Sequence, residues 1–516
     1  MFGKKRKRIQ EKENVKKSGK LFIIVGVLAL VVLIGIFLRE QPVKETVLSS
    51  QLVELKDGET FSIEAKPVTK IIDGRELELF TYNGQFPGPL LKVKQNSKIF
   101  IDFKNNIGQD TTIHWHGLRH NYKFDGVPDV SQPPVKSGET FRYELFFPDT
   151  GVFWYHPHIR EDIQQERGMY GMIIVEQEDQ EQKPREIPLI VDDMLLEKND
   201  FYPFSEKFTN FALMGRFGNI LLLNGEVQPQ IKVRQGETVR FYLLNTANVR
   251  PFNLSIKNNL LQVIGSDIGA YEQPFTTASI IIAPAERYIV ETAFAQPGEY
   301  DIMHINPDAT YKLGKMIVES SETETQTETQ ALPQTDLAKY KQYFTQAPDF
   351  EYTLDIDMRG MVMNMDMHRE DETIEWEDNM FMMNEMHNSL MMSWFIEDKK
   401  TGKRNMDVMA DVKQDDIKMI RIKNEKNSMH PMQHPIHLHG QRFLVVRQDG
   451  QENKNLVWKD TILISKGSAV DLLVDFSNPG IWMMHCHIAE HLHSGMMMKF
   501  EVKGGEKNET EFRENR

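Results

Sequence analysis

The hydrophobic positions of this chain alternate with polar ones in three stretches that resemble one another: 90–106 (LLKVKQNSKIFIDFKNN), 231–246 (IKVRQGETVRFYLLNT) and 412–424 (VKQDDIKMIRIKN). Each has apolar–polar alternation, then a turn, then alternation again, which predicts two strands joined by a short loop. A further stretch closes each copy in a similar way: 151–159, 297–305 and 478–488. The pattern therefore predicts an all-β chain built from three copies of a Greek-key β-sandwich.

The predicted domain boundaries follow from these repeats. A chain of 516 residues is long enough for about three cores. Residues 320–335 (SSETETQTETQALPQT) are poor in apolar side chains, which predicts an exposed linker between the second and third copies. After Lys503 the chain is polar, which is typical of a disordered tail. We expect three domains, a linker and a tail, in this order: 45–180, 184–320, 321–344 (the linker), 345–504 and 505–516 (the tail).

The N-terminal region predicts attachment to a membrane. Residues 1–20 are strongly basic, and residues 21–38 (LFIIVGVLALVVLIGIFL) are apolar without a charge. This length is just sufficient to span a bilayer, and the basic flank places the N-terminus in the cytoplasm. A cleaved signal peptide is the alternative, but its apolar core is usually shorter, and no clear small-residue cleavage site follows residue 38. We expect an uncleaved, single-pass transmembrane anchor in the cell membrane, with extracytoplasmic domains.

Composition narrows the possible functions. The formal net charge is −14, which disfavours nucleic acid as a partner. Cys486 is the only cysteine, so an internal disulfide is excluded. In an exported protein, metal ligation explains a single thiol better than packing does. The 28 methionines are unusually numerous, and they cluster.

Paired histidines recur in the first and third copies. Four segments carry them: His114-Trp115-His116, His156-Pro157-His158, His434-Pro435-Ile436-His437-Leu438-His439 and His485-Cys486-His487. Alternate side chains of a strand share a face, so each His-x-His pair presents both imidazoles to one side. One such pair is more often a surface coincidence, but four pairs at matching positions of two copies indicate a metal centre. The middle copy has only His304 in these positions, and we interpret that residue as structural.

The segment 485–496 predicts two metal sites at once. In an extended strand, His485 and His487 face one way and Cys486 faces the other. Cys486, His491 and Met496 offer the thiolate, imidazole and thioether of a blue-copper electron-transfer site, whose second imidazole comes from elsewhere. With His434 assigned to that site, eight paired imidazoles remain. Eight imidazoles are the right number for a two-plus-three-plus-three set on three copper ions.

These segments resemble the four copper-binding motifs of the multicopper oxidases, the family of laccases, ascorbate oxidase, and bacterial cuprous and spore-coat oxidases. The resemblance covers residues 50–503. It implies three cupredoxin-like domains, four copper ions, and four one-electron oxidations coupled to the reduction of O2 to two waters. It assigns His434, Cys486, His491 and Met496 to the type 1 copper, His114 and His437 to the type 2 copper, and two sets to the type 3 pair: His116, His156 and His487, and His158, His439 and His485.

Reduction of O2 also consumes protons, and the resemblance suggests which acids supply them. Asp125 matches the position where bacterial members carry an acid near the cluster, although a turn-forming Asp-Gly is the alternative. Relatives often have a second acid directly after the last type 1 histidine. This chain has Leu492 there, as in ascorbate oxidase and many fungal laccases, and Glu490 is only a loose substitute.

Methionines in the third copy favour Cu(I) as the substrate. A methionine-rich run extends from Met358 to Met392, and thioethers prefer Cu(I), although the same residues could fill a core. In cuprous oxidases of this family, a Met two residues before the first type 1 histidine and an Asp four residues before it bind substrate copper. This chain has Met432 at the first position and His430 at the second, with Met429 beside them.

The leading hypothesis is a membrane-anchored cuprous oxidase for copper tolerance, with O2 and Cu(I), or another small reductant, as partners. A laccase-like oxidase of phenols is the alternative, and Glu370, Asp371 and Glu372 keep a ferroxidase open. A non-enzymatic copper-binding or scaffold protein is a remote alternative, because such members usually lack cluster ligands. The third copy disfavours a two-domain copper nitrite reductase. We expect a monomer.

Overall fold

The structure is a computed structural model, and it describes residues 45–177, 184–321, 332, 336–358 and 373–504. The predicted basic segment 1–20, membrane anchor 21–38 and tail 505–516 lie outside these residues. In the described part of the chain, no helix is both long and apolar enough to cross a membrane. The chain divides into Met1–Glu45 and Thr46–Arg516, and the sheets of the described residues lie in the second part.

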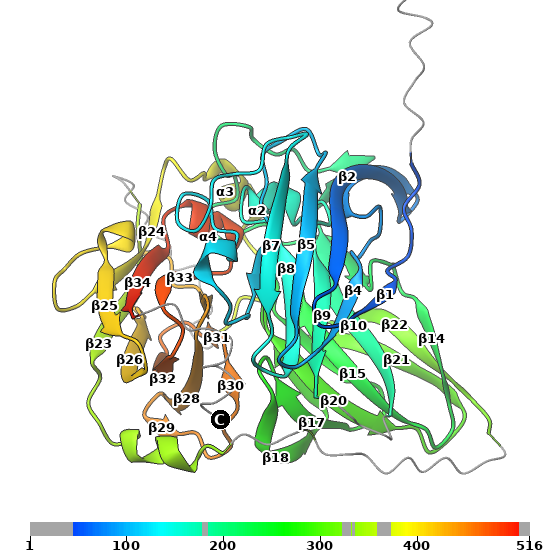
Figure 1. Cartoon of the computed structure of the whole chain (residues 1–516). Coiled ribbons are helices and arrows are strands. Elements are labelled where there is room, and N and C mark those ends of the chain that lie inside the picture. Colours follow the sequence, from blue (N-terminus) through cyan, green and yellow to red (C-terminus); the bar gives the residue numbers. More distant parts are fainter. Residues whose placement is uncertain (1–44, 178–183, 322–331, 333–335, 359–372, 505–516) are drawn as a thin grey trace, which may run out of the picture. The chain divides into compact units, whose positions relative to one another are not determined.

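Six large sheets form three face-to-face pairs within Thr46–Arg516 (Figure 1). Each pair is a β-sandwich, because one apolar cluster joins the inner faces of its two sheets. The alternation of apolar and polar residues produces this arrangement, since one face of each sheet must be covered by another sheet. The all-β prediction is confirmed.

The first sandwich pairs a five-stranded sheet with a four-stranded one. The five-stranded sheet has the order β1 (Leu52–Leu55), β4 (Leu90–Lys94), β9 (Gly171–Glu176), β8 (Gly151–His156) and β6 (His114–His116). The four-stranded sheet has the order β3 (Arg75–Tyr82), β2 (Thr60–Ile72), β5 (Lys98–Asn105) and β7 (Thr140–Phe146). Two short helices, η1 (Tyr122–Phe124) and α2 (Glu161–Gln164), follow β6 and β8.

The middle sandwich pairs a six-stranded sheet with a five-stranded one. The six-stranded sheet has the order β13 (Ile220–Leu223), β10 (Arg185–Met194), β15 (Thr238–Asn245), β20 (Arg287–Ala293), β17 (Leu261–Ser266) and β18 (Ala270–Thr277). The five-stranded sheet has the order β14 (Gln230–Arg234), β22 (Thr310–Glu319), β21 (Gly298–Ile305), β16 (Phe252–Ile256) and β19 (Ser279–Ile282). A small ribbon of β11 (Leu196–Glu197) and β12 (Asp200–Phe201) precedes β13.

The third sandwich has the largest sheet and three of the six helices in the described chain. Its seven-stranded sheet runs β24 (Ser393–Asp398), β23 (Phe350–Asp357), β26 (Asp416–Asn424), β32 (Ala469–Phe476), β28 (Arg442–Gln448) and β29 (Gln451–Glu452), with β30 (Trp458–Lys459) also on β28. The other sheet runs β25 (Met409–Lys413), β34 (Met497–Lys503), β33 (Gly480–Cys486), β27 (His434–Leu438) and β31 (Thr461–Ile464). The helices are α3 (Phe381–Met386), η3 (Asn405–Asp407) and α4 (Ala489–His493).

Two parallel strand pairings recur in every sandwich. One is β4 with β9, β14 with β22 and β25 with β34; the other is β2 with β5, β10 with β15 and β23 with β26. The three alternating stretches of the sequence form consecutive strands: β4 and β5, β14 and β15, and β25 and β26. The two strands of each stretch belong to opposite sheets of the sandwich. The turn between them therefore connects the two sheets and does not close a hairpin within one sheet.

The predicted exposed stretch 320–335 lies mostly outside the described residues, whereas the C-terminal part of the predicted linker 321–344 is described and packs against a core. Residues 338–343 form the 3₁₀ helix η2 (Ala338–Tyr343), and Leu337, Tyr340 and Phe344 are buried. They join the apolar cluster of the first sandwich, where the ring of Tyr340 meets Trp458 edge to face at 4.9 Å. The spacing of the three apolar residues puts them on one face of the helix. The pattern is hard to recognise in the sequence because polar residues surround it.

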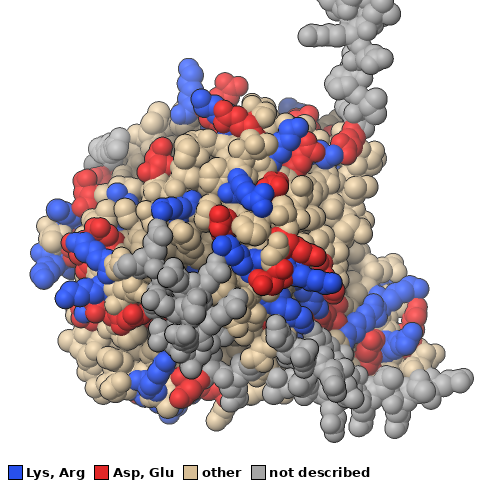
Figure 2. Space-filling model, in the orientation of Figure 1, with Lys and Arg blue, Asp and Glu red and all other residues tan. Residues whose placement is uncertain are grey.

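The surface above these cores carries mixed charge. On the face seen in Figure 2, acidic and basic side chains are interspersed without a large area of either sign. Interspersed charges of this kind keep a protein soluble without defining a charged binding surface on that face.

Truncation of Tyr340 tests the packing of η2. We expect Tyr340→Ala to lower the free energy of unfolding by about 3 kcal/mol, because a buried aromatic ring leaves a cavity. Gln342→Ala, on the exposed side of the same helix, should change it by less than about 0.5 kcal/mol. Urea denaturation followed by tryptophan fluorescence measures both, and equal effects would mean that η2 is not packed.

Candidate metal centre

Four strands deliver the paired histidines, and strand pairing sets them opposite one another. In the first sandwich, His114 of β6 lies directly across from His156 of β8. In the third sandwich, His437 of β27 lies directly across from His485 of β33. Alternation turns the next residue, Cys486, to the other face of its strand.

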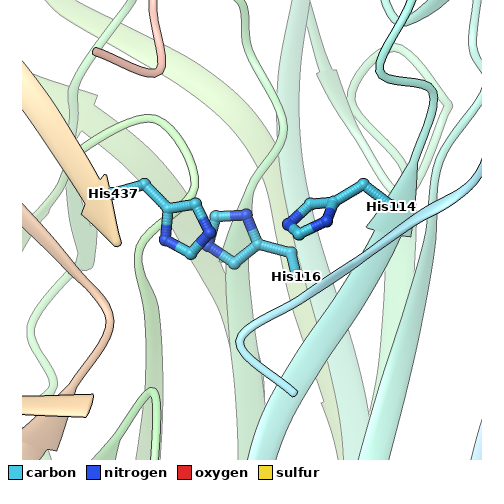
Figure 3. Close-up of side chains that lie close together, drawn as sticks. All are labelled: His114, His116 and His437. Carbon is cyan, nitrogen blue, oxygen red and sulfur yellow. The ribbon is translucent and has the colours of Figure 1, made fainter. Parts of the chain in front are cut away.

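Eight imidazoles from the first and third sandwiches converge in one buried volume. Their donor atoms lie within 4.8 Å of one another in three groups: His114, His116 and His437; His116, His156 and His487; and His158, His439 and His485. Figure 3 shows the first group, in which the ring of His437 stacks on that of His116 with the centroids 3.6 Å apart. The second and third groups contain the same histidines as the two type 3 sets of the resemblance, whereas the first adds His116 to the type 2 pair, His114 and His437.

Outer hydrogen bonds determine which ring nitrogen faces this volume. Four rings donate from Nδ1 to a main-chain oxygen and so keep Nε2 for the centre: His114 to Asp125 (2.8 Å), His156 to Pro157 (2.8 Å), His437 to Asp460 (2.9 Å) and His485 to Cys486 (2.8 Å). His116 differs, because its Nε2 donates to Asp460 Oδ1 at 3.0 Å and leaves Nδ1 for the centre. Anchoring through the outer nitrogen is typical of histidines that bind metals.

The inner nitrogens are buried and have no hydrogen-bond partner among the described residues. They are Nε2 of His114, His156, His158 and His437, Nδ1 of His116, and both nitrogens of His487. Nε2 of His439 and Nε2 of His485 lie only 2.8 Å apart. Buried polar atoms without partners are costly, and cations shared among neutral imidazoles remove that cost. The donors therefore fit copper ions, for which imidazole is a suitable ligand.

Cys486 forms a fourth group with His434 and His491 on the other face of β33. Its Sγ lies 3.6 Å from Nδ1 of His434 and 3.7 Å from Nδ1 of His491, and those nitrogens are 3.3 Å apart. Similar distances among three donors are expected around a single ion. Met496 is fully buried beside them, and its main chain bonds to those of both His491 (3.0 Å) and Cys486 (3.1 Å). The donor set of this group fits a type 1 copper.

Burial controls the protonation of these ligands. It lowers the pKa of His434 to about 3 and that of His158 to about 4, so both imidazoles are neutral at pH 7 and have a lone pair to donate. Burial also raises the pKa of the Cys486 thiol. A bound copper ion would reverse that shift, because coordination deprotonates a thiol.

The two predicted acids occupy different positions. Asp125 is buried, and its carboxylate lies 2.9 Å from Nδ1 of His439 and 3.2 Å from Nδ1 of His114. Glu490 is also buried, but its carboxylate accepts a hydrogen bond from Asn248 of the middle sandwich at 2.8 Å. Burial, and then the charge of Asp162, raise the pKa of Glu490 to about 8. Asp125 thus contacts two cluster histidines, whereas Glu490 is held by the middle sandwich.

Sequence reasoning missed an acid near the type 3 histidines. Glu161 of α2 lies 3.0 Å from Nδ1 of His158 and 2.7 Å from Nε2 of His493. His493 belongs to one more His-x-His pair with His491, but the chain is helical there, so the two rings point in different directions. The contact joins the first sandwich to the third.

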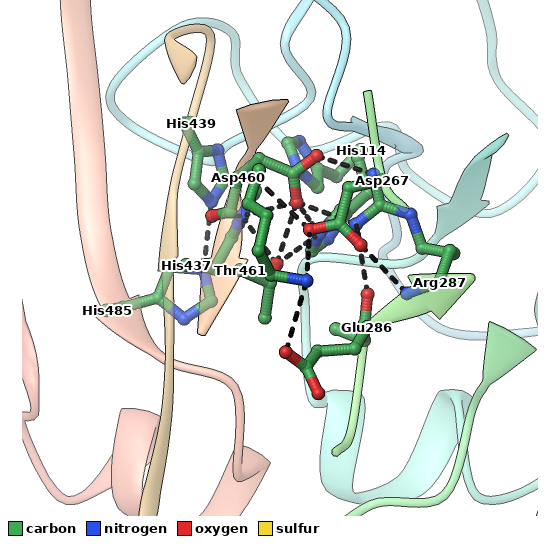
Figure 4. Close-up of polar contacts among 12 residues, drawn as sticks. His114, Asp267, Glu286, Arg287, His437, His439, Asp460, Thr461 and His485 are labelled. Atoms are coloured by element: carbon green, nitrogen blue, oxygen red, sulfur yellow. Dashed lines mark hydrogen bonds and ion pairs between the residues drawn. The ribbon is translucent and has the colours of Figure 1, made fainter. Parts of the chain in front are cut away.

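An ionic network beside the cluster was also missed (Figure 4). Asp460 is fully buried and pairs with Arg287 of the middle sandwich at 2.5 Å. Lys459 is buried as well, 3.3 Å from Asp267 and 3.2 Å from Glu286. The only signal in the sequence is the pair Lys459-Asp460 within an apolar run, LVWKDTILI. Charged residues in such a run must find partners, because an isolated buried charge is costly.

The predicted substrate residues are divided between core and surface. Met432 is fully buried and His430 is 4% exposed, whereas Met429 is 49% exposed. On α3, Met382 is 77% and Met386 66% exposed.

Two other methionines of the rich run are buried. Met358 and Met392 lie in the core of the third sandwich, which agrees with the packing alternative for these two. Met361, Met363, Met365 and Met367, together with Asp366, His368, Glu370, Asp371 and Glu372, lie outside the described residues.

Trp394 covers the thiolate group, and sequence reasoning did not identify it. Its ring lies 4.2 Å from the ring of His491 and 4.9 Å from that of His434, between centroids. Its indole N–H donates to the carbonyl of Ala212 at 2.8 Å. The middle part of the chain therefore fixes the ring that shields this group.

Family models described as multicopper oxidase match residues 64–180, 172–327 and 376–506. The chain belongs to the multicopper oxidase family. Members of this family bind copper and are oxidoreductases that use O2, so the buried donor groups of this multicopper oxidase have a known kind of occupant.

Relatives of this multicopper oxidase include proteins with different names. A multicopper oxidase of Staphylococcus aureus is 27% identical over 451 residues, which are 85% of this chain and 87% of the relative. A laccase-like multicopper oxidase of Ochrobactrum sp. has a similar structure, with a TM-score of 0.71, 24% identity, and coverage of 89% of this chain and 100% of that one. A multicopper oxidase of Campylobacter jejuni, described as a metallo-oxidase, has a TM-score of 0.68 at 21% identity and covers 90% of this chain and 98% of that one. At these identities, the structures show the fold alone.

His304 belongs to no donor group in the part of the chain that the structure describes. It is buried in the middle sandwich, and its Nδ1 accepts a hydrogen bond from the main-chain N–H of Asn253 at 3.1 Å. Burial, and then the nearby charge of Arg250, lower its pKa to about 3. The ring therefore acts as a neutral acceptor in a core, in agreement with the structural interpretation.

This pKa predicts an acid sensitivity. The unfolded chain protonates His304 below about pH 6.5, whereas the folded chain resists protonation down to about pH 3. The unfolded state then binds more protons, so stability is lost as the pH falls through that window. We expect His304→Gln, which keeps an acceptor, to remove as much as about 3 kcal/mol of the difference in unfolding free energy between pH 7 and pH 4. Urea denaturation at both pH values measures it, and an unchanged difference would contradict the shifted pKa.

Proposed function

We propose that this enzyme oxidises a substrate one electron at a time at a type 1 copper and passes the electrons to O2 at a trinuclear copper cluster. The observation that carries the proposal is the segment His485-Cys486-His487. Within three consecutive residues it contributes to the thiolate group and to two imidazole groups. A single strand end therefore joins an electron-accepting site to an O2-reducing one.

The protein's own residues perform four tasks in this scheme. Bound copper would supply the one-electron redox chemistry and the site where O2 accepts electrons. Cys486, His434, His491 and Met496 would hold the type 1 copper, and soft ligands keep both of its oxidation states accessible. The main chain between Cys486 and its neighbours gives electrons a short covalent path, and Trp394 and the buried walls exclude water. The other eight histidines would hold the remaining three copper ions: His114, His116, His156, His158, His437, His439, His485 and His487.

Asp125 and Glu490 are proposed as the acids that supply protons. The contacts of Asp125 with His114 and His439 support a part as a relay, because a carboxylate there can accept a proton that enters from solvent and pass it on to the cluster through a short path. For Glu490, support comes from a pKa of about 8, which keeps a proton available on a buried acid at pH 7.

We further propose that the substrate is Cu(I) and that the enzyme serves copper tolerance. The exposed thioethers of Met382, Met386 and Met429 support this, because soft sulfur ligands favour Cu(I) over harder ions. Beneath them, Met380 and Met383 of the α3 region pack on the core that contains Met432. Cu(I) captured at the surface would be passed inward to Met432 and His430, next to His434 in the chain.

Two other substrates are kept as alternatives. A laccase-like oxidation of phenols is supported by the similarity to laccases, and a ferroxidase by the acids 370–372. A non-enzymatic copper-binding or scaffold role is disfavoured, because each donor group is complete.

The location of the enzyme is part of the same proposal. The basic segment 1–20 and the apolar segment 21–38 support a single-pass anchor in the cell membrane, with the three sandwiches outside the cytoplasm. There the enzyme would act as a monomer on copper that reaches the cell surface.

Replacement of the exposed methionines tests the substrate. We expect the triple variant Met382→Leu, Met386→Leu, Met429→Leu to raise KM for Cu(I) about tenfold, since the loss of weak ligands worth about 1.4 kcal/mol has that effect. Oxidation of 2,6-dimethoxyphenol should not change. O2 consumption with each substrate measures both. Met409→Leu, at an exposed methionine of β25, is the matched control. If the Cu(I) kinetics of the triple variant are unchanged, and every variant and the wild type oxidise the phenol faster than Cu(I), the laccase-like alternative is the better one.

Substitution of Asp125 tests the supply of protons. We expect Asp125→Asn to slow O2 consumption about 100-fold, because an amide cannot accept a proton and pass it on as a carboxylate does. Anaerobic reduction of the type 1 copper should keep its rate, since it precedes the proton-consuming step. Copper content must match the wild type, and Asp129→Asn, at an exposed acid of the same loop, is the control. Wild-type turnover in fully loaded Asp125→Asn would refute this role.

A further inference from the structure

The middle sandwich provides no residue of any donor group in the described chain, yet it reaches the cluster with one side chain. Arg287, the first residue of β20, is fully buried. Its Nε donates to the carbonyl of Val152 in the first sandwich at 2.8 Å. Its Nη1 and Nη2 donate to the two carboxylate oxygens of Asp460 in the third sandwich, at 2.7 and 2.5 Å (Figure 4). One guanidinium therefore contacts all three sandwiches.

Asp460 passes this contact on to two cluster histidines. Its Oδ1 accepts from Nε2 of His116 at 3.0 Å, and its main-chain oxygen accepts from Nδ1 of His437 at 2.9 Å. The hydroxyl of Thr461 donates to the same Oδ1 at 2.8 Å. The two imidazoles that Asp460 holds are the ones whose rings stack at 3.6 Å.

We propose that Arg287 is a positioning residue of the copper cluster, which acts through Asp460 on His116 and His437. The bidentate pair prevents the carboxylate from rotating, because two parallel N–H···O bonds define its plane. With its plane defined, Oδ1 stays aimed at Nε2 of His116, and the ring must present Nδ1 to the cluster. The middle sandwich thus acts on the chemistry without binding a metal.

The surroundings leave the pair no room to shift. A Cβ on Gly117 would lie 2.5 Å from Asp460 Oδ2 and 2.9 Å from Arg287 Nη2, so only glycine allows the approach, and its φ is +88°. Asp267 contacts both partners: its carboxylate accepts a hydrogen bond from the main-chain N–H of Arg287 at 2.9 Å and one from the main-chain N–H of Asp460 at 3.3 Å. Such closely supported contacts are expected where ligand orientation matters.

A purely mechanical brace between the sandwiches is the competing explanation. Both explanations predict that loss of Arg287 destabilises the fold, since a buried carboxylate would lose its partner. They differ in the copper itself: a positioning residue changes the copper affinity of the cluster, which His116 would help to hold, and the spectrum of the type 2 copper, which His437 would help to hold, and a brace changes neither. The inference rests on the assignment of His116 and His437 as copper ligands in the proposed function, and it is independent of the substrate.

The test compares Arg287→Met and Arg287→Lys with Arg240→Met in the full-length, copper-loaded enzyme. Arg240 is the matched control, because it is a buried arginine of the same sheet that pairs with Glu291 at 2.8 Å. The readouts are copper content, copper affinity by competition with a chelator, the electron paramagnetic resonance signal of the type 2 copper, and the thermal midpoint. In Arg287→Met we expect cluster affinity to fall about 10- to 100-fold and the type 2 signal to change, with the blue type 1 absorption intact.

The remaining variants decide between the explanations. Arg287→Lys keeps the charge but loses the paired geometry, so its affinity should lie between those of the wild type and Arg287→Met. Arg240→Met should lower the thermal midpoint and leave the type 2 signal unchanged. Wild-type affinity and signal in Arg287→Met, or an equal loss in Arg240→Met, would overturn the inference. If Arg287→Met does not fold, wild-type affinity and signal in Arg287→Lys would overturn it. If the wild-type enzyme binds only a type 1 copper, the trinuclear cluster of the proposed function is refuted instead.

Discussion

Imidazole rings that are buried together lose their hydrogen bonds to water, and this cost is offset when their nitrogens bind a shared cation. The rest of this structure follows from that cost. Eight rings from two sandwiches turn one nitrogen inward, where the described protein offers hardly any hydrogen-bond partner, and most turn the other outward to a carbonyl or carboxylate. Cations bound at such a centre would offset the cost of burying these nitrogens between the sandwiches. The ligands therefore belong to the folding problem as much as to the chemistry.

All three sandwiches contribute residues to the metal centre or to the contacts that surround it. The first and third supply every ligand, but the carboxylate of Glu490 is held by Asn248 and the ring of Trp394 by Ala212, both in the middle part of the chain. Arg287 adds a third such contact, to Asp460. The middle sandwich thus contacts residues that surround the donor groups although it contributes no donor of its own in the described chain. Rigid ligands need little reorganisation when copper changes its oxidation state, which suits electron transfer.

Much of the fold and of the metal centre could be predicted because both follow from a period of two. Alternation identified the strands, and the same alternation put His114 and His116 on one face and Cys486 opposite its neighbours. What could not be predicted depends on partners distant in the chain. Glu161 and Arg287 have no local pattern, Asp460 is marked only by its place in an apolar run, and each of the three has a partner in another sandwich. Tyr340 was hidden because its apolar face lies within a polar run. Met432 is buried and Met429 is exposed, although the two are the same residue type only three positions apart, so the sequence does not distinguish them.

The position of Cys486 between two cluster histidines has a consequence for how such an enzyme can change over time. The two metal centres share one strand end, and a shift of one residue in the pairing of β33 with β27 would exchange their faces. An insertion or deletion there would cost the protein both centres in a single event. Neither centre can be lost by such a step, nor relocated, while the other is kept. The electron donor and the oxygen site are therefore inherited as one unit, and variation is confined to the covering regions, such as α3, that determine what reaches the first of them.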